Sequence, residues 1–204
     1  MTNKSYHHGD LRRALIKQAA LVIDTQGIEA LTLRGLARDL GVSHGAPNRH
    51  FRNKGELLAA LATEAYHQVN LATQKAAEAS DSEGHGPVRR LNAMGRGFLR
   101  WALDNRALFN AINHPDIKRS ADDALLASMR AFQLAAREAT MAAQKAGRYP
   151  EKDPRILALF TNSVPFGAAQ LIDHEVFAAE IDHLSREQLI VELMDYVVPI
   201  LDEP

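Results

Sequence analysis

Residues 32–51, TLRGLARDLGVSHGAPNRHF, constrain the fold more strongly than any other stretch, because they predict two short helices joined by a tight turn. Thr32 can cap the first helix and Gly41 can end it. Ala37 is small where the helices would cross, and Pro47 lies in the first turn of the second helix, where a missing N–H costs little. The spacing is that of a helix-turn-helix. We therefore expect a short, sharply started helix within the stretch SHGAPNRHF.

The charge of the chain is unevenly distributed. The net charge is only −1, but residues 1–54 contain nine Lys and Arg against four Asp and Glu, a local balance of +5. The remaining 150 residues therefore sum to −6. Such an asymmetry favours contact between the N-terminal quarter and a polyanion. The alternative is that these basic residues only solvate a helical surface.

Helical periodicity continues along the chain, and no segment shows the sustained alternation of a strand. The predicted fold class is therefore all-α, with about nine helices. Residues 80–87, SDSEGHGP, have the composition of a linker. Asp153 and a Ser185–Gln188 capping box mark the starts of the last two helices. Besides a helix ending before Gly27 and the two around Gly41, helices are expected from about Gly55 to Ala79, Pro87 to Ala102, Asn105 to Ile112, Asp123 to Ala146, Pro154 through Gly167, and Ser185 to about Leu201.

Composition excludes several kinds of site. The chain contains no cysteine, which rules out disulfides, thiolate metal sites and a cysteine nucleophile. With 46% hydrophobic residues it can bury a core, yet no stretch approaches the roughly 18 uninterrupted apolar residues of a membrane helix. The start, MTNKSYHHGDLRR, lacks the apolar run of a signal peptide. We therefore expect a soluble cytoplasmic protein with no membrane partner.

The histidines do not form a recognisable metal or catalytic pattern. His44 and His50 are six positions apart, so they do not share a helical face as an i, i+4 pair of ligands would. Asp173-His174 and Asp182-His183 indicate a solvated connection between helices, with cation binding as the alternative. No nucleophile and base stand at recognisable spacing. We therefore predict no catalytic residue, no metal and no cofactor.

His7 and His8 belong to a polar arm before the first helix. A flexible terminus is one interpretation, and contact with a minor groove or a phosphate is the other. The sequence leaves both open.

Residues 6–61, YHHGDLRRALIKQAALVIDTQGIEALTLRGLARDLGVSHGAPNRHFRNKGELLAAL, resemble the DNA-binding domain of the tetracycline-repressor (TetR) family of bacterial transcription regulators. The opening YHHGDLR, the block APNRHF and Gly167 are similar to the branch whose C-terminal domain is named for a Trp-His-Gly motif. Only the glycine of that motif is present, with Asn162 and Phe166 where the other two residues are expected.

The resemblance implies a helix-turn-helix DNA-binding domain over residues 1–54. Early positions of a recognition helix reach base edges, and helix N-termini favour nearby phosphate. Relatives usually carry Tyr at the place of Asn48, whose amide can still donate a hydrogen bond but lacks the aromatic reach. The residues implied to contact bases or phosphates are Arg34, Ser43, His44, Gly45, Ala46, Asn48, Arg49, His50 and Lys54.

The resemblance also implies that residues 55–204 bind a small effector and form a homodimer. Small residues after Pro165 let another helix approach closely, although both last helices could instead bury this surface within one subunit. The residues expected in a ligand pocket are Met94, Phe98, Trp101, Phe109, Met129, Phe132, Asn162 and Phe166, with core packing as the alternative. The residues expected at the dimer interface are Gly167, Ala168, Leu171, Leu189, Leu193 and Val197.

The function implied is a homodimeric repressor that a small molecule releases from a palindromic DNA operator. One alternative is a dimeric DNA-binding regulator without an effector. A more remote alternative is an α-helical enzyme.

Overall fold

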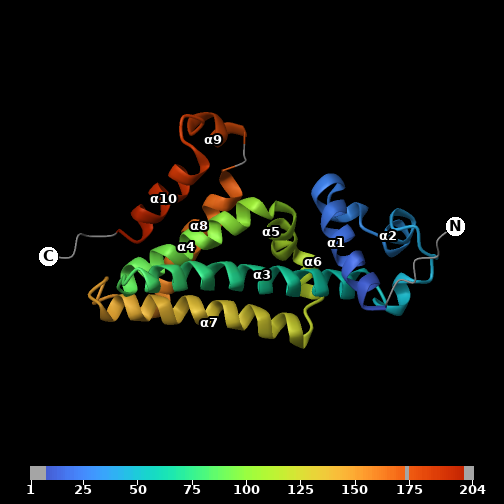
Figure 1. Cartoon of the computed structure of the whole chain (residues 1–204), viewed down its shortest axis with the longest axis horizontal. Coiled ribbons are helices and arrows are strands. Elements are labelled where there is room, and N and C mark those ends of the chain that lie inside the picture. Colours follow the sequence, from blue (N-terminus) through green and yellow to red (C-terminus); the bar gives the residue numbers. More distant parts are fainter. Residues whose placement is uncertain (1–7, 173–174, 200–204) are drawn as a thin grey trace. The chain divides into compact units, whose positions relative to one another are not determined.

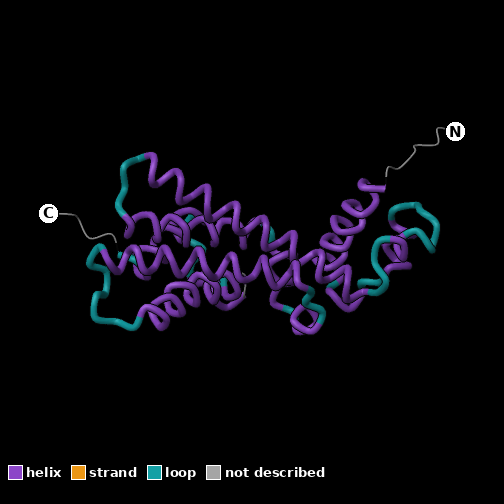
Figure 2. The backbone as a smooth tube through the Cα atoms, turned by 90° about the horizontal axis from the view of Figure 1, so that it is seen from below, coloured by secondary structure: helices purple, strands orange, loops and turns teal. Residues whose placement is uncertain are grey.

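The computed structural model describes residues 8–172 and 175–199, and within them every regular element is a helix (Figures 1 and 2). This confirms the predicted all-α class, with a helix count close to the one expected. The chain divides into two compact units. The first contains the chain up to Tyr66 together with Asn105–Ser128, and the second contains His67–Asp104 together with the chain from Met129 onward. Both units are built from segments that are not continuous along the chain, and the functional division at residue 54 stays a prediction.

The helices of the first unit include the predicted helix-turn-helix region. Two helices, α3 (Lys54–Ser82) and α7 (Asp123–Lys145), begin in the first unit and end in the second. The other elements of the first unit are α1 (His8–Gln26), η1 (Ile28–Ala30), α2 (Leu33–Asp39), η2 (Pro47–Arg49), α5 (Arg106–Asn113) and α6 (Pro115–Arg119). The other helices of the second unit are α4 (Pro87–Asp104), α8 (Pro154–Leu171), α9 (Glu175–Glu180) and α10 (Arg186–Val197).

Local signals account for the bounds of α2. The Thr32 hydroxyl accepts a hydrogen bond from the backbone N–H of Gly35 at 3.0 Å, which satisfies a donor that the first turn would otherwise leave unpaired. Gly41 ends the segment with a φ of +66°, a conformation that costs residues with a Cβ more than it costs glycine. The predicted cap and the predicted turn are both confirmed.

The stretch after Gly41 is not the α-helix that the sequence predicted. Residues 44–46 form a turn, and Pro47–Arg49 form a single 3₁₀ turn. Pro47 has no N–H to donate to the carbonyl of Ser43, and that carbonyl instead accepts from Ala46 at 2.9 Å. The bonds from Arg49 to Ala46 at 3.3 Å and from His50 to Pro47 at 2.9 Å also span three residues, and the N–H of Phe51 donates to Pro47 across four residues at 2.9 Å. Proline in the first turn therefore changes the hydrogen bonding more than expected, because the segment has only one or two turns.

Apolar side chains from α1, α2 and α3 form the core that holds this turn in place. Leu15, Leu36 and Leu57 are fully buried, and Phe51 follows η2 into the same unit. The guanidinium of Arg12 lies 5.3 Å from the centre of the Phe51 ring, a cation–π distance. The predicted recognition segment is thus anchored at Phe51 and at the buried Pro47, and Ser43, His44, Gly45, Asn48 and Arg49 remain exposed.

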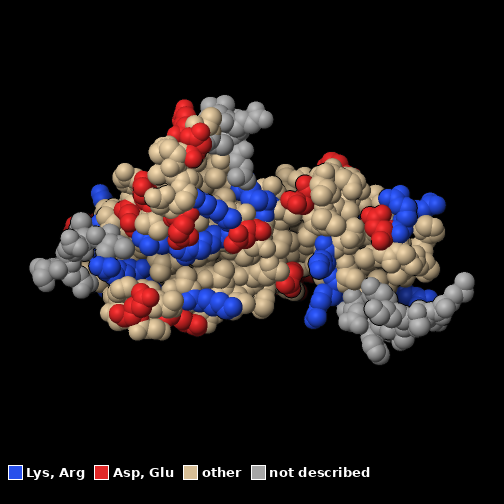
Figure 3. All heavy atoms as spheres, turned by 45° about the horizontal axis from the view of Figure 1, so that its top comes forward, with Lys and Arg blue, Asp and Glu red and all other residues tan. Residues whose placement is uncertain are grey.

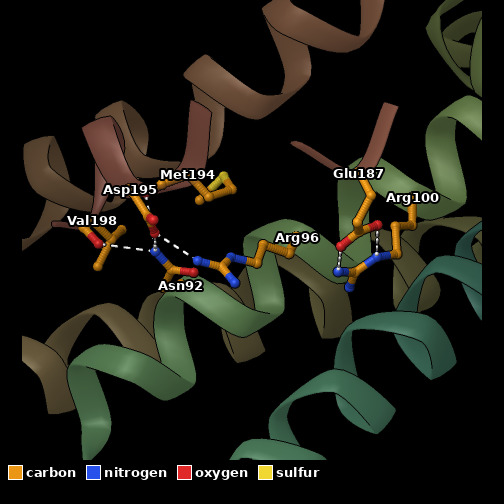
Figure 4. Close-up of polar contacts among 7 residues, drawn as sticks. All are labelled: Asn92, Arg96, Arg100, Glu187, Met194, Asp195 and Val198. Atoms are coloured by element: carbon orange, nitrogen blue, oxygen red, sulfur yellow. Dashed lines mark hydrogen bonds and ion pairs between the residues drawn. The ribbon is translucent and has the colours of Figure 1, made fainter. Parts of the chain in front are cut away.

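In the second unit, α4 packs against α8 and α10. Asn92 of α4 is buried, and its amide donates to the carbonyls of Met194 and Val198 at 3.2 and 3.0 Å and to Asp195 (Figure 4). One and two turns further along α4, Arg96 pairs with Asp195 at 2.7 Å and Arg100 pairs with Glu187. This row of polar contacts fixes α10 on α4. The pKa of Glu187 is lowered, chiefly by its hydrogen bond from Arg100.

The start and end signals of the remaining helices give a mixed result. The Ser185–Gln188 capping box is present, and Asp153 accepts from the backbone N–H of Arg155 at 2.8 Å, as expected. Arg155 also holds the pKa of Asp153 down at about 2. The sequence reasoning missed α6 and α9, both short, and it ended α3 three residues too early at Ala79. Among the described residues, no helix is long and apolar enough to cross a membrane.

Candidate nucleic-acid interface and apolar cavity

Most of the residues implied to contact DNA lie at the surface of the first unit. Lys54, His50 and Ala46 are half-buried, and the rest are exposed. Lys and Arg side chains stand out from the surface of this unit in Figure 3. The exposed set consists of Arg34, Ser43, His44, Gly45, Asn48 and Arg49.

Arg34 and His44 line one hollow of about 460 Å³, which also has Thr32, Arg38 and Asp39 in its wall. These positions are ten residues apart in sequence, and the turn at Gly41 brings them together. The hollow does not include Asn48 or Arg49, which lie outside its wall. The predicted base-reading residues are therefore divided between a hollow and the exposed 3₁₀ turn.

Arg34 and Arg49 carry charges that the described part of the chain does not neutralise by an ion pair. Two neighbouring arginines do have carboxylate partners, since Arg38 lies 3.3 Å from Asp39 and Arg52 pairs with Glu56. An unpaired, exposed guanidinium can donate two parallel hydrogen bonds to a guanine edge or to a phosphate. Arg34 and Arg49 are thus available to bind an anionic partner.

Lys54 has a structural contact that the sequence did not reveal. Its ammonium donates to the backbone carbonyl of Ile28 at 2.7 Å. This bond ties the first turn of α3 to η1 and leaves further N–H groups on the same nitrogen. Lys54 can therefore meet a phosphate and keep this internal contact at the same time.

A second local feature fixes the entrance to α3. The side chain of Asn53 accepts from the backbone N–H of Glu56 at 2.9 Å, and Glu56 accepts from the backbone N–H of Arg52 at 2.7 Å. The latter bond is the main cause of a lowered pKa for Glu56. The spacing Asn-x-x-Glu at residues 53–56 is a capping signal that sequence reasoning could have used.

The second unit contains a cavity of about 220 Å³ among α3, α4, α7, α8 and α10. Of the residues expected in a pocket, Met94, Phe98, Phe132, Asn162 and Phe166 do line it. The ring of Phe98 lies 6.0 Å from that of Phe132 and 6.4 Å from that of Phe166, so the three rings form one aromatic wall.

The remaining expected pocket residues do not line this cavity. Trp101 is buried beside Phe98, with ring centres 6.4 Å apart. Phe109 is fully buried in the first unit, with the guanidinium of Arg106 5.9 Å from its ring centre. Met129 is half-buried on α7 outside the lining. Trp101 and Phe109 are buried, as the alternative of core packing expects.

The sequence reasoning missed the rest of the lining, which is mostly small, apolar or hydroxyl-bearing. Leu91 and Gly95 fall on the same face of α4 as Met94 and Phe98, so a helical wheel could have included them. The other missed members depend on how the helices pack, which no local pattern shows. They are Thr73, Ala135, Ala136, Leu159, Thr161, Ser163, Pro165, Met194 and Val198.

The residues expected at a dimer interface differ in their exposure. Leu171 is 47% exposed, and a methyl group added at Gly167 would have open space around it. Ala168, Leu189 and Leu193 are half-buried. Val197 is 3% exposed and is buried with Ile190 and Met194 within the same chain, so its side chain does not face outward.

Apolar side chains that sequence reasoning did not single out are exposed on the same two helices. On α8 they are Ile156, Leu159 and Phe160, which are 65%, 66% and 47% exposed, and on α10 Tyr196 is 81% exposed. Ile156, Phe160, Gly167 and Leu171 follow one side of α8 at helical spacing. An apolar strip of this kind is typical of a surface that another protein covers.

Among the described residues no group of three or more His, Asp or Glu could hold a metal ion. Asp182 and His183 are both exposed in the connection before α10, while Asp173-His174 and His7 lie outside the described residues. His8 begins α1.

Comparison with known proteins agrees with the geometry of the first unit. Residues 15–61 match the family model described as "Bacterial regulatory proteins, tetR family". This segment carries the whole helix-turn-helix region and is less than a quarter of the chain. No curated protein matches the chain.

Solved structures show the same fold over nearly the whole chain. A protein of unknown function from Rhodococcus sp. RHA1 is 28% identical, with a TM-score of 0.77 and coverage of 96% of this chain and 97% of that one. A bacterial regulatory protein in the tetR family from Rhodococcus RHA1 is 23% identical, with a TM-score of 0.72 and coverage of 98% and 100%. The fatty acid degradation regulator FadR from Bacillus halodurans is 14% identical, with a TM-score of 0.71 and full coverage of both chains.

Proposed function

We propose that the chain is a DNA-binding transcriptional regulator of the TetR type, acting in the cytoplasm. The observation that carries this proposal is the exposed pair Arg34 and Arg49 on a helix-turn-helix whose segment matches the family model. Arg34 and His44 share a hollow that suits base edges, while Asn48 and Arg49 on the 3₁₀ turn suit phosphates. The YHHGDLR and APNRHF blocks and Gly167 support a place in the Trp-His-Gly branch. Nothing in the described site suggests catalysis.

The regulator acts as a homodimer in this proposal. A second copy covers the apolar strip of α8 formed by Ile156, Phe160, Gly167 and Leu171, and Leu189, Leu193 and Tyr196 of α10 extend the same surface. Two copies of one reading unit, about one DNA turn apart, bind a palindromic operator. Sedimentation at two protein concentrations tests the dimer directly.

The cavity of the second unit is the effector site in this proposal, and its occupation lowers operator affinity. Occupation changes affinity only if the effector prefers one state of the dimer over another. A regulator with the same operator but no effector is the rival, and the cavity argues against it. A thermal-shift screen separates the two, because a ligand that binds the folded state raises the melting temperature.

Selection of genomic DNA fragments with the purified protein tests the DNA-binding function. We expect a palindromic sequence to be enriched and the Arg34→Ala, Arg49→Ala double variant to enrich none. Arg137→Ala is the matched control, since Arg137 is an exposed arginine on α7, outside the helix-turn-helix region. Failure of the unaltered protein to enrich any sequence, or equal loss in the Arg137→Ala control, would contradict the proposal.

A further inference from the structure

The lining of the cavity in the second unit restricts the kind of molecule that it accepts. None of the described residues that line it carries a charge. The guanidinium of Arg90 lies 3.6 Å from the sulfur of Met94, and it is paired with Asp81 at 3.1 Å. An ion that leaves water for this lining loses part of its hydration and finds no opposite charge among the lining residues, so the lining disfavours both anions and cations.

The few polar groups in the lining have already used most of their donors. The hydroxyl of Thr73 donates to the carbonyl of Val69, that of Thr161 to Ala158, and that of Ser163 to Phe160, at 3.0–3.2 Å. Each hydroxyl oxygen can still accept a hydrogen bond.

Asn162 completes this polar group. One N–H of its amide donates to the carbonyl of Ala158 at 2.7 Å, which leaves the second N–H able to donate and the carbonyl oxygen able to accept. The lining therefore offers more acceptors than donors, and a ligand with a hydroxyl group matches it better than one with a carbonyl group.

The size and the aromatic wall narrow the class further. A cavity of about 150 Å³ lined by apolar side chains is large enough to bind benzene. The volume here, about 220 Å³, leaves room for a ring with one or two small substituents. The three rings of Phe98, Phe132 and Phe166, at 6.0–6.4 Å, can pack against such a ring at favourable aromatic distances.

We propose that the cavity binds a compact, uncharged aromatic molecule that carries one hydroxyl group. The inference rests on the proposed role of this cavity as the effector site. The chemical class of the ligand follows from the uncharged lining, from the oxygen atoms that can still accept a hydrogen bond, and from the aromatic wall.

The test uses three probes with one apolar body: 4-ethylphenol, ethylbenzene and 4-ethylbenzoate. Affinity for the full-length protein is measured by calorimetry and by thermal shift. We expect 4-ethylphenol to bind about three- to tenfold more tightly than ethylbenzene, because one hydrogen bond is gained. We expect 4-ethylbenzoate, ionised at neutral pH, to bind at least about a hundredfold more weakly than 4-ethylphenol.

A matched pair of variants shows whether the probe binds in this cavity. Ala135→Trp places a large side chain at an exposed position of the lining, and we expect it to abolish binding of 4-ethylphenol. Ala131→Trp, one turn earlier on α7, is also exposed but lies outside the lining and should leave binding unchanged. The melting temperatures of both variants without probe show that each remains folded.

The outcomes separate this inference from the proposed function. Equal or tighter binding of 4-ethylbenzoate, binding that survives Ala135→Trp, or no binding of either neutral probe at about 1 mM would overturn the inference. DNA selection is independent of all three results. If 4-ethylphenol binds as expected but leaves operator affinity unchanged, the ligand class stands and the effector role fails.

Discussion

The contact between α3 and α4 yields a prediction that can be worked out from the structure. A methyl group added at Gly97 of α4 would lie 2.9 Å from the Cβ of Ala76 and 3.0 Å from the carbonyl oxygen of Ala72. Neither neighbour can turn away, since one is attached directly to the backbone and the other belongs to it. Carbon atoms normally pack at about 3.5–4.0 Å, so Gly97→Ala must push the two helices apart.

Two opposing effects set the magnitude for Gly97→Ala. Overpacking a well-packed contact costs about 1–3 kcal/mol, and a contact whose neighbours cannot move aside lies in the upper part of this range, at about 2–3 kcal/mol. Alanine recovers about 1 kcal/mol, because it is a better helix former than glycine in a helix interior. We therefore expect a net loss of about 1–2 kcal/mol in the free energy of unfolding, or about 2–8 °C in melting temperature for a chain of this size.

Gly167→Ala is the matched control on α8. An added methyl group there meets nothing within 4 Å in the single chain, so only the gain of about 1 kcal/mol in helix propensity remains. If a second copy packs on Gly167, the same methyl group weakens the dimer instead. Urea denaturation at low and high protein concentration measures both effects. A Gly97→Ala variant as stable as the unaltered protein would refute the close contact of α3 and α4.

Three further predictions concern single contacts. Arg34→Ala should cost about 1–3 kcal/mol on the selected operator and much less on random DNA, measured by fluorescence anisotropy, and equal losses would contradict base reading. Lys54→Met should lower the free energy of unfolding by about 1–2 kcal/mol through the lost bond to Ile28 and reduce the salt slope of DNA binding by about one, whereas unchanged stability in urea would show that the bond contributes nothing. The pKa of Glu187 is lowered by Arg100, so their pair stabilises the fold above the ordinary carboxyl pKa and loses this effect as the pH falls through the lowered value. Glu187→Gln should therefore cost less than about 1 kcal/mol at neutral pH and nothing in acid, and a cost that grew in acid would reverse the assigned sign.

Signals that act within a few residues were read correctly from the sequence. The cap at Thr32, the positive φ at Gly41 and the capping box at Ser185 each depend on neighbours along the chain, so their geometry follows from residue type. Pro47 shows where such reading failed. Its effect was judged only from its place in the first turn, but in a segment of one or two turns the missing donor leaves most of the hydrogen bonds spanning three residues.

Features that depend on packing between helices could be predicted only in part. Phe98 and Trp101 stand three residues apart on α4 and are both aromatic, yet one lines the cavity and the other is buried beside it. The same holds for Val197, whose apolar position on α10 indicated an exposed interface but is buried within its own chain. Sequence periodicity shows that a residue lies on the apolar face of its helix. It does not show whether that face packs in the core, lines a cavity or contacts a second copy of the chain.

α3 contains residues of both proposed sites, so ligand binding at one site can affect DNA binding at the other through this helix. Lys54, in the first turn of α3, donates a hydrogen bond to Ile28 of η1, which precedes the helix-turn-helix region in the sequence. Thr73, later in the same helix, lines the cavity. A ligand that alters the packing around Thr73 acts on a helix whose other end is held by the Lys54 contact. If Lys54 also binds a phosphate, that contact belongs to the DNA-bound state, and a ligand that favours another position of α3 competes with it. Such coupling does not require the ligand to touch the helix-turn-helix region. It requires only that α3 has two positions, one preferred by DNA and the other by the ligand.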